Sequence, residues 1–281
     1  MLRLGAEKLS NKQPPPLLPL RGFRETAYVQ SRVLDALVIR YLLSRYGRDN
    51  IGFVWLLMQP ILLTLLIVIF WTLSGRLDGR GINVAAFALS GFMPLSLWRF
   101  MSTGAGINLI QKNRNLLYHR DITYLDIVFA TQALEFIGTT AAMVIVTSIL
   151  IILGVIAPIQ DYYAAIMGWL LMGALGFGFG CLIAGLTAWS KTVKEIIPPI
   201  QLIVTTTSGA FFMVAWLPEK AREVITYLPL AHAFEGVRAG FMGPTFTTYY
   251  DFAYGFAWAL GVSAIGLWLI TAVWENVDIE R

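Results

Sequence analysis

Residues 51–74 read IGFVWLLMQPILLTLLIVIFWTLS, an apolar run without a charged side chain. A helix needs about 20 apolar residues to cross the roughly 30 Å hydrocarbon core of a bilayer, and this run is long enough to do so. Similar runs recur along the chain, so we predict an all-α membrane protein with six transmembrane helices. The predicted spans are residues 51–74, 83–108, 127–153, 164–188, 197–217 and 252–274.

The composition agrees with a membrane protein. Of the 281 residues, 57% are hydrophobic and 14% are charged, whereas a soluble domain has about 25% charged residues. The net charge of +4 is distributed loop by loop, so it does not indicate a nucleic-acid partner. The single cysteine, Cys181, lies inside an apolar run. It excludes an intramolecular disulfide and is expected to be a packing residue.

The lysines and arginines predict the orientation of the spans. Fifteen of the 21 flank one side of the membrane, five flank the other, and Arg99 lies within a span. Cytoplasmic loops carry the excess of positive charge in membrane proteins. Both termini are therefore predicted to be cytoplasmic.

Two segments precede the spans. Residues 1–24, which include PPPLLPL, are expected to form a disordered cytoplasmic tail. Residues 25–50 carry apolar stripes that alternate with charges, which is typical of an amphipathic helix lying in the membrane interface. The helix has two interpretations: it anchors the first span, or it presents arginines to a lipid or pyrophosphate group, because guanidinium binds phosphate with two parallel hydrogen bonds. The arginines concerned are Arg40, Arg45 and Arg48.

Two charges fall inside predicted spans. Glu135 lies in the third span and should face protein or water, because an unpaired charge at the bilayer centre costs about 2.5–3.5 kcal/mol. Arg99 lies late in the second span and can extend to the interface. So few intramembrane ionisable groups argue against a proton-coupled carrier. Pro198 and Pro199 are placed in the first turn of the fifth span, where proline is acceptable.

Small residues indicate where helices pack closely, and aromatic residues have two interpretations. Gly176 and Gly180 are four residues apart, which favours close helix packing. Most tryptophans lie near predicted span ends, as in an interfacial belt. Alternatively, some of them line a passage in which aromatic faces stack on sugar rings. The candidates for such a passage are Trp55, Gln59, Trp71, Trp98 and Gln201.

The segment between the fifth and sixth spans, residues 217–244, holds two short apolar patterns separated by Pro229. It is too polar for a full span and too apolar for a free loop. We predict a re-entrant helical hairpin on the outer side of the membrane. Glu235 and Arg238 are three residues apart and can pair on one helix face.

The sequence lacks the common nucleotide-binding, catalytic and metal-binding motifs. It contains no GxxxxGK[ST], so the chain does not bind ATP through a P-loop of its own, and it contains no HExxH, GxSxG or CxxC. The two histidines, His119 and His232, are placed on opposite sides of the membrane by the predicted topology. A membrane enzyme or a metal site is therefore not expected.

Four stretches resemble the permease subunit of ABC-2-type exporters, and in particular the permeases of capsular polysaccharide export. The first is IRYLLSRYGRDNIGFVWLLMQPILLTLLIVIF (39–70), similar to the family's interfacial helix and first span. The others are NRNLLYHRDITYLDIVFATQALE (113–135), SGAFFMVAWLP (208–218) and LPLAHAFEGVRAGF (228–241). The last departs from the family at Leu228, where asparagine is usual. Order and spacing make the resemblance specific, and residues 51–281 become the six-span domain.

The resemblance implies a homodimer of permeases with two copies of a separate P-loop ATPase, which would bind the ATP and Mg²⁺ because this chain binds neither. It also implies that residues 113–126 form a coupling helix that docks into the ATPase. Apolar side chains would seat this helix and charged ones would set its register. The residues concerned are Arg114, Leu116, Leu117, Tyr118, His119, Arg120 and Asp121.

The implied substrate is a lipid-linked capsular polysaccharide carried across a bacterial inner membrane, with periplasmic and outer-membrane partners beyond. The alternatives within the superfamily are O-antigen, teichoic acid, or a small lipid or drug. An ion-coupled carrier or channel that acts alone is an alternative from another class. Transport by the purified chain without an ATPase would identify the latter.

Overall fold

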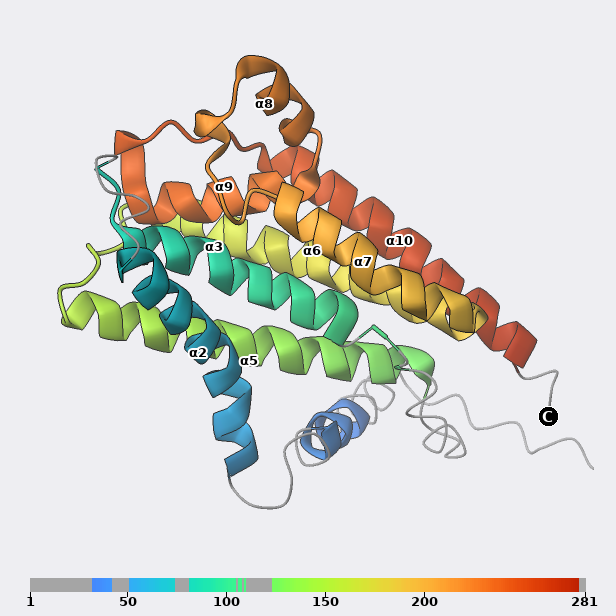
Figure 1. Ribbon diagram of the computed structural model, residues 1–281. Helices are drawn as coiled ribbons and strands as arrows, with labels where there is room; N and C mark the ends of the chain where they lie inside the picture. The colour runs from blue at the N-terminus through green and yellow to red at the C-terminus, as the bar shows by residue number, and fades with distance from the viewer. Residues whose placement is uncertain are drawn as a thin grey trace, which may run out of the picture.

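The computed structural model describes residues 32–41, 51–73, 81–104, 106–107, 109 and 123–277, and this part of the chain is built from helices without strands (Figure 1). Four helices within it are long and apolar enough to cross a membrane. They cover Val84–Thr103, Tyr124–Ile152, Tyr162–Trp189 and Phe252–Ala272. The protein is therefore an all-α membrane protein, as the apolar runs predict.

The long helices alternate in direction. They are α2 (Ile51–Leu73), α3 (Val84–Arg99), α5 (Tyr124–Ile152), α6 (Tyr162–Trp189), α7 (Lys191–Thr207) and α10 (Phe252–Val277). One end of the bundle gathers residues 81–83, 153–161 and 208–251 (Figure 1); we call it the α8 end. The side chain of Asn83 donates to the carbonyl of Val155 there, at 2.7 Å. The opposite end holds the start of α5, the α6–α7 junction and the end of α10.

Helix α3 lies at the centre of the bundle. Every residue from Ala85 to Trp98 is buried, which is the pattern of a helix surrounded on all sides. Beyond Arg99 the helix continues as one π-helical turn, η1 (Phe100–Gly104). Arg99 itself is exposed.

Helix α6 packs closely on several neighbours through glycines. A Cβ atom at Gly168 would lie 2.5 Å from the backbone nitrogen of Val237 in helix α9 (Pro229–Met242). A Cβ atom at Gly176 would lie 2.9 Å from the Cβ of Met101 in η1. At Gly266 of α10, the corresponding atom would lie 2.7 Å from the Cβ of Cys181, which is a buried packing residue as expected. Small residues therefore set the distances between these helices, as they do in other membrane bundles.

The fifth predicted span has the wrong boundaries, and the second ends at Gly104 and not at residue 108. Helix α7 starts at Lys191, after a single residue outside the helices, Ser190, and it ends at Thr207 instead of residue 217. Pro198 and Pro199 consequently lie in the middle of the helix and not in its first turn. Hydropathy placed the start too late because the polar first turn, which includes Lys194, extends beyond the apolar run.

The segment between α7 and α10 forms short helices. A 3₁₀ turn, η3 (Val214–Trp216), is followed by α8 (Glu219–Thr226), α9 and a second 3₁₀ turn, η4 (Gly243–Thr245). Helix α8 has no buried residue, whereas α9 is buried from Leu230 to Phe241. The two short apolar patterns of the sequence thus become two short helices with different burial.

We expect Gly168→Ala to lower the stability of the protein. The added methyl group would meet backbone atoms of α9, and overpacking of this kind costs about 1–3 kcal/mol. The matched control is Gly261→Ala in α10, where an added Cβ would have no atom within 4 Å. Thermal melting in detergent, followed by size-exclusion chromatography, measures both variants. Equal melting temperatures for the two would contradict the packing described for Gly168.

Candidate functional site

Three buried polar side chains lie on one stripe of α9. His232, Glu235 and Arg238 follow one another at three-residue intervals, and their exposed fractions are 5%, 0% and 0%. The helix begins with Pro229 in its first turn, where the missing N–H costs nothing, and it ends at Gly243 with a φ of 63°. This geometry directs the three side chains toward the segments that surround α9 at the α8 end.

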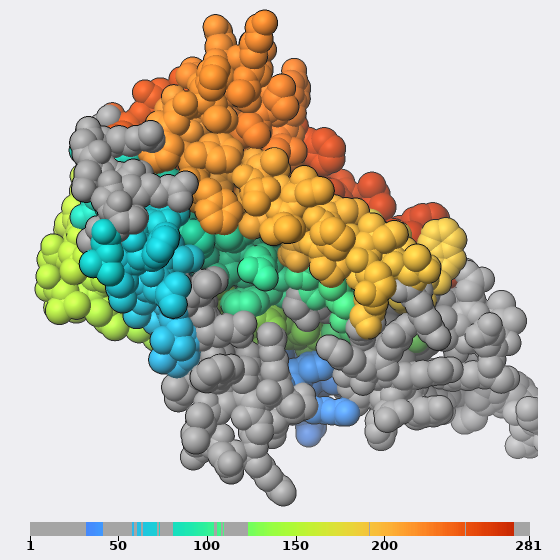
Figure 2. Space-filling model, viewed as in Figure 1, coloured from blue at the N-terminus to red at the C-terminus, as the bar shows by residue number. Residues whose placement is uncertain are grey.

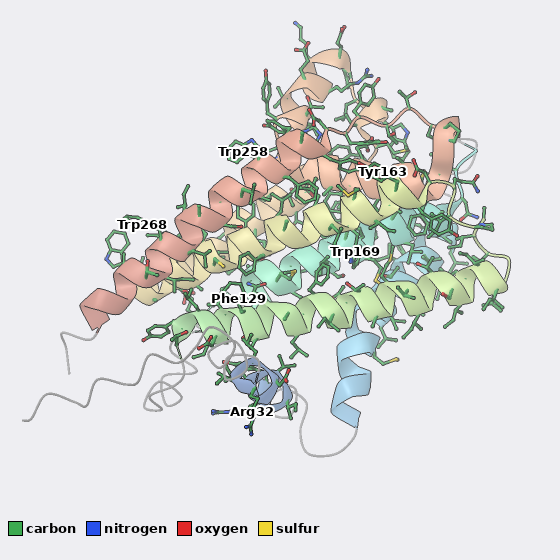
Figure 3. All side chains as sticks on the ribbon, turned by 180° about the vertical axis from the view of Figure 1, so that it is seen from behind. Arg32, Phe129, Tyr163, Trp169, Trp258 and Trp268 are labelled. Atoms are coloured by element: carbon green, nitrogen blue, oxygen red, sulfur yellow. The ribbon has the colours of Figure 1, made fainter. Side chains whose placement is uncertain are left out.

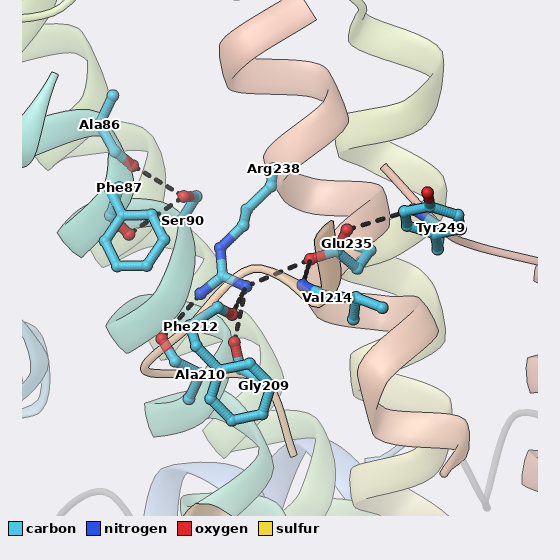
Figure 4. A network of polar contacts seen from close by, with 10 residues as sticks. All are labelled: Ala86, Phe87, Ser90, Gly209, Ala210, Phe212, Val214, Glu235, Arg238 and Tyr249. Carbon is cyan, nitrogen blue, oxygen red and sulfur yellow. Dashed lines mark hydrogen bonds and ion pairs between the residues drawn. The ribbon is translucent and has the colours of Figure 1, made fainter. Parts of the chain in front are cut away.

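The guanidinium of Arg238 binds the irregular segment after α7 (Figure 4). Its Nη1 atom donates to the carbonyl oxygens of Gly209 at 2.6 Å and Phe212 at 2.7 Å. Its Nη2 atom donates to the carbonyl of Ala210 at 2.7 Å. Gly209 has a φ of 93°, which only glycine adopts without strain, and this turns the carbonyls toward the arginine. One side chain thereby satisfies three carbonyls that no helix satisfies.

The guanidinium also lies over the ring of Phe87 in α3, with its Cζ atom 4.6 Å from the ring centroid. Such cation–π contacts are stronger when they are desolvated. Helix α3 can come this close because it carries glycine at position 91. A Cβ there would lie 2.5 Å from the carbonyl oxygen of Ala210 and 3.3 Å from Nη2 of Arg238. The arginine therefore connects α9, the 209–212 segment and the central helix.

Glu235 completes the charge balance. Its Oε1 atom lies 3.5 Å from Nη1 of Arg238 and accepts the backbone N–H of Val214 at 3.2 Å. Its Oε2 atom accepts the N–H of Tyr249 at 3.2 Å. A buried ion pair is tolerated when further hydrogen bonds compensate its charges. Glu235 has such bonds at both carboxylate oxygens and Arg238 has them at both terminal nitrogens, whereas its Nε has no partner among the described residues. The pair that the sequence suggests does form, and it also fixes the chain on both sides of α9.

His232 holds the remaining two segments of the α8 end. Its Nδ1 atom accepts the N–H of Asp251 at 2.9 Å, and its Nε2 lies 2.8 Å from the carbonyl oxygen of Thr226. A carbonyl only accepts, so Nε2 carries the hydrogen and the imidazole is neutral in this arrangement. The histidine thereby joins the end of α8 to the start of α10.

The opposite end of the bundle is held by neutral amides. The Nε2 atom of Gln132 in α5 donates to the carbonyl oxygen of Met101 in η1 at 2.9 Å. The Nε2 atom of Gln201 in α7 donates to Oγ of Ser102 at 3.1 Å. A π-helical turn leaves carbonyls without their usual partners, and such turns occur often at functional positions. Three helices therefore meet at η1 through neutral hydrogen bonds, and one turn along α5 from Gln132 lies the completely buried Glu135.

The interfacial segment is described in part. Residues 32–41 form a helix whose Leu37 is buried against the start of α5, beside Tyr124 and Ile127. Burial raises the pKa of Tyr41 to about 12, while a hydrogen bond with Thr131 and the charge of Arg40 oppose the rise. Arg40 is exposed.

Several predicted site residues lie outside the described residues. They are Arg45, Arg48 and the coupling residues Arg114, Leu116, Leu117, Tyr118, His119, Arg120 and Asp121.

The five passage candidates have three different outcomes. Trp71 is buried and stacks on Phe87 with 5.5 Å between ring centroids, and Trp98 is buried beside Phe179. Both tryptophans therefore pack inside one chain. Gln201 is half-buried and faces η1 as described. Trp55 and Gln59 lie on α2, and their side chains are outside the described part. A role for these five residues in a passage stays a prediction.

Helices α2 and α7 lie on the same face of the molecule, and part of α3 shows between them (Figure 2). Both helices carry large apolar side chains that are exposed. On α7 these are Ile196, Ile200, Leu202 and Ile203, and on α2 they are Leu62, Leu66, Ile69, Phe70 and Leu73. We call these residues the α2/α7 face.

Comparison with known proteins gives the class of this chain. Residues 32–242 match the model of the ABC-2 type transporter family, and the chain belongs to that family. It is 34% identical over 257 residues to the capsule polysaccharide export inner-membrane protein CtrC of Neisseria meningitidis, covering 92% of this chain and 97% of the relative. It is 32% identical to the corresponding protein BexB of Haemophilus influenzae (91% and 96% covered) and 22% identical to the polysialic acid transport protein KpsM of Escherichia coli (76% and 83%).

The sequence did not indicate which atoms Arg238 would bind. The pair spacing was visible, but the carbonyls of residues 209–212 are 26 to 29 residues away along the chain. Gly209 and Gly91 were the available signals, because both permit unusual backbone positions. The π-helical turn with Gln132 and Gln201 was also missed, since amides inside apolar runs do not reveal their partners.

Arg238→Met should destabilise the protein strongly, because it leaves Glu235 as an unpaired buried charge, a loss of about 3–5 kcal/mol. Arg222→Met is the control, since Arg222 is half-buried and lies over the ring of Tyr249 at 4.7 Å. Thermal melting in detergent compares them. Adding Glu235→Gln to Arg238→Met should recover part of the loss. A double variant with the full sum of both losses would contradict the pairing.

Proposed function

We propose that this chain is the membrane-spanning subunit of an ATP-driven exporter that moves lipid-linked capsular polysaccharide across a bacterial inner membrane. The observation that carries the proposal is the similarity to capsule export inner-membrane proteins over more than nine tenths of the chain, together with membership of the ABC-2 type transporter family. The bundle supports it by combining a fixed end with an end held through neutral hydrogen bonds.

In this proposal six helices span the membrane: α2, α3, α5, α6, α7 and α10. Both termini lie in the cytoplasm and the α8 end faces the periplasm, following the distribution of lysine and arginine. Helices α8 and α9 form the re-entrant hairpin. The buried α9 enters the bundle and α8 stays at its surface. An irregular backbone within the membrane requires satisfied polar groups, which the bonds of Arg238 and Glu235 provide.

Two copies of the chain pair through the α2/α7 face. Both helices carry large exposed isoleucines, leucines or phenylalanine, and oligomers of identical chains commonly pair through one self-complementary surface. A glycan passage between the copies would lie along this face, beside Gln201 and Ser102. The lipid-phosphate end of the substrate would meet Arg40, Arg45 and Arg48 of the interfacial segment.

ATP hydrolysis takes place on a partner, because this sequence has no P-loop. Two ATPase subunits, each with ATP and Mg²⁺, would receive residues 113–126 as a coupling helix. This segment joins α3 and η1 to α5, so a displacement imposed on it pulls directly on the π-helical turn and on Gln132. Periplasmic and outer-membrane proteins would continue the route.

The experiment that tests the function is purification of the tagged chain after expression with its neighbouring genes, followed by an ATPase assay. A stoichiometric P-loop subunit with vanadate-sensitive turnover, and glycan export that depends on both proteins, is the expected result. Transport by the lone chain would replace the proposal with an ion-coupled carrier or channel. A complex that exports only a small lipid or drug would overturn the substrate.

Charge reversal of the coupling segment should separate the subunits. We expect Arg114→Glu with Arg120→Glu to reduce co-purification of the ATPase, because register is set by opposite charges, while insertion of the permease is unchanged. Arg99→Glu is the matched control, since Arg99 is exposed at the end of α3 and outside the coupling segment. The measurement is the ratio of ATPase to permease after purification, from quantitative staining of a gel. An undiminished ATPase band would refute the coupling role.

The pairing of two copies can be tested by cross-linking. We expect Leu66→Cys combined with Ile203→Cys, in a chain with Cys181→Ala, to give a covalent dimer with a short bismaleimide in membranes. Leu66 and Ile203 are 66% and 62% exposed and lie on the α2/α7 face. The control is Ile265→Cys in α10, which is 55% exposed on another helix. Equal dimer yields from both chains would argue against this face as the interface.

A further inference from the structure

A groove of about 460 Å³ lies between α5 and α6, close to the α8 end. Figure 3, which views the molecule from behind, labels the lining residue Trp169 between the two helices. Its walls come from residues 136–151 of α5 and 162–170 of α6, and its inner side from Val237 and Phe241 of α9. The family's coupling and passage roles do not involve this surface, and the proposed function leaves it unexplained.

The groove is built for hydrocarbon. Its lining is mostly Ile, Leu, Val, Met, Phe and Trp. Two of the polar side chains in the lining bind each other: Nε1 of Trp169 donates to Oγ1 of Thr140 at 2.9 Å, and this hydroxyl donates to the carbonyl of Phe136 at 2.6 Å. These polar groups therefore have partners within the protein, and the surface favours an apolar occupant.

The exposed apolar residues around the groove indicate that its occupant is a lipid acyl chain. Val144, Ile166 and Leu170 line the groove and are 59%, 55% and 43% exposed, and further exposed isoleucines continue from it along α5. This surface lies on two helices that are long and apolar enough to cross a membrane, so in a bilayer it would contact the acyl chains of lipids. From Phe136 to Ile151 the groove follows α5 for roughly 22 Å at 1.5 Å per residue. That exceeds the roughly 15 Å half-thickness of a bilayer core, so one acyl chain of one leaflet can lie in it.

The mouth of the groove adds a headgroup preference. Tyr162 lines it at the start of α6 and is 62% exposed. Tyrosine is enriched at membrane interfaces, so this side chain suits the headgroup region. Asp161 lies between the lining residues Ile159 and Tyr162 and is exposed. Residues 147–170 contain no lysine or arginine. The only charge at this rim within residues 147–170 is thus negative, which suits an ammonium group better than a headgroup with net negative charge.

We infer that the α5/α6 groove binds one acyl chain of a zwitterionic, ethanolamine-type phospholipid as a fixed part of the protein. Val237 and Phe241, which form the inner side of the groove, flank Arg238 along α9. A bound chain therefore fills the space behind the helix whose other face carries the ion pair with Glu235. Occupancy of the groove supports the position of α9 and so the whole α8 end. The leaflet concerned is the periplasmic one in the proposed orientation.

The test uses the full chain, purified in mild detergent with any partner that accompanies it. Native mass spectrometry should show a retained phosphatidylethanolamine, which Val144→Trp removes because the indole fills the groove. Ile145→Trp is the matched control: Ile145 neighbours Val144, is 40% exposed and is outside the lining. It should retain the lipid. Loss of the adduct should also lower the melting temperature, and adding the lipid back should restore it in the native chain but not in Val144→Trp.

Three outcomes would overturn the inference. The first is equal retention by Val144→Trp and Ile145→Trp. The second is photo-labelling by a diazirine-bearing phosphatidylethanolamine that spreads evenly over α5, α6 and α10. The third is preferential retention of phosphatidylglycerol, or of the exported lipid itself, which would refute the assigned headgroup. Lipid retention is measured without transport or ATPase activity, so a failure of the proposed exporter function would not be confused with a failure of this site.

Discussion

The arrangement of the bundle depends on the hydrogen bonds between one buried guanidinium and an irregular backbone segment. Arg238 binds three carbonyls of an irregular segment, and Glu235 neutralises the charge while accepting two backbone N–H groups. Irregular backbone is costly in a membrane unless every polar group has a partner. These two residues meet this requirement for the chain between α7 and α8, and the chain can therefore leave α7, turn and return as α9 beside α3.

The two ends of the molecule are held by different kinds of hydrogen bond. At the α8 end the bonds are charge-assisted, and bonds of this type are about twice as strong as neutral ones. At η1 the bonds come from the amides of Gln132 and Gln201, which are neutral and can exchange one carbonyl or hydroxyl for another. The end that the proposed ATPase would reach is thus the one whose contacts are easier to rearrange. A force applied there can change the packing of α3 while the other end keeps its shape.

The surfaces of the bundle divide in a similar way. The α2/α7 face carries large apolar side chains beside half-buried Gln201, which suits contact with a second copy and a path between copies. The α5/α6 side carries a groove in which two polar side chains of the lining are already paired, which suits a lipid tail. Both surfaces are apolar, so hydropathy alone treats them alike. Their difference lies in where the few polar groups point and whether these groups already have partners.

The sequence by itself determined the membrane class, the long helices and their alternation, because an apolar run of sufficient length has few other stable states in water or lipid. It also indicated the Glu235–Arg238 pair, since residues three apart share a helix face. It misplaced the ends of α7, because the polar first turn resembles a loop on a hydropathy scale. The partners of Arg238, the π-helical turn held by Gln132 and the α5/α6 groove were decided only by the tertiary structure. Each of them joins segments far apart in the chain, and such contacts follow from packing distances that glycines such as Gly91 and Gly168 permit, which no local pattern records.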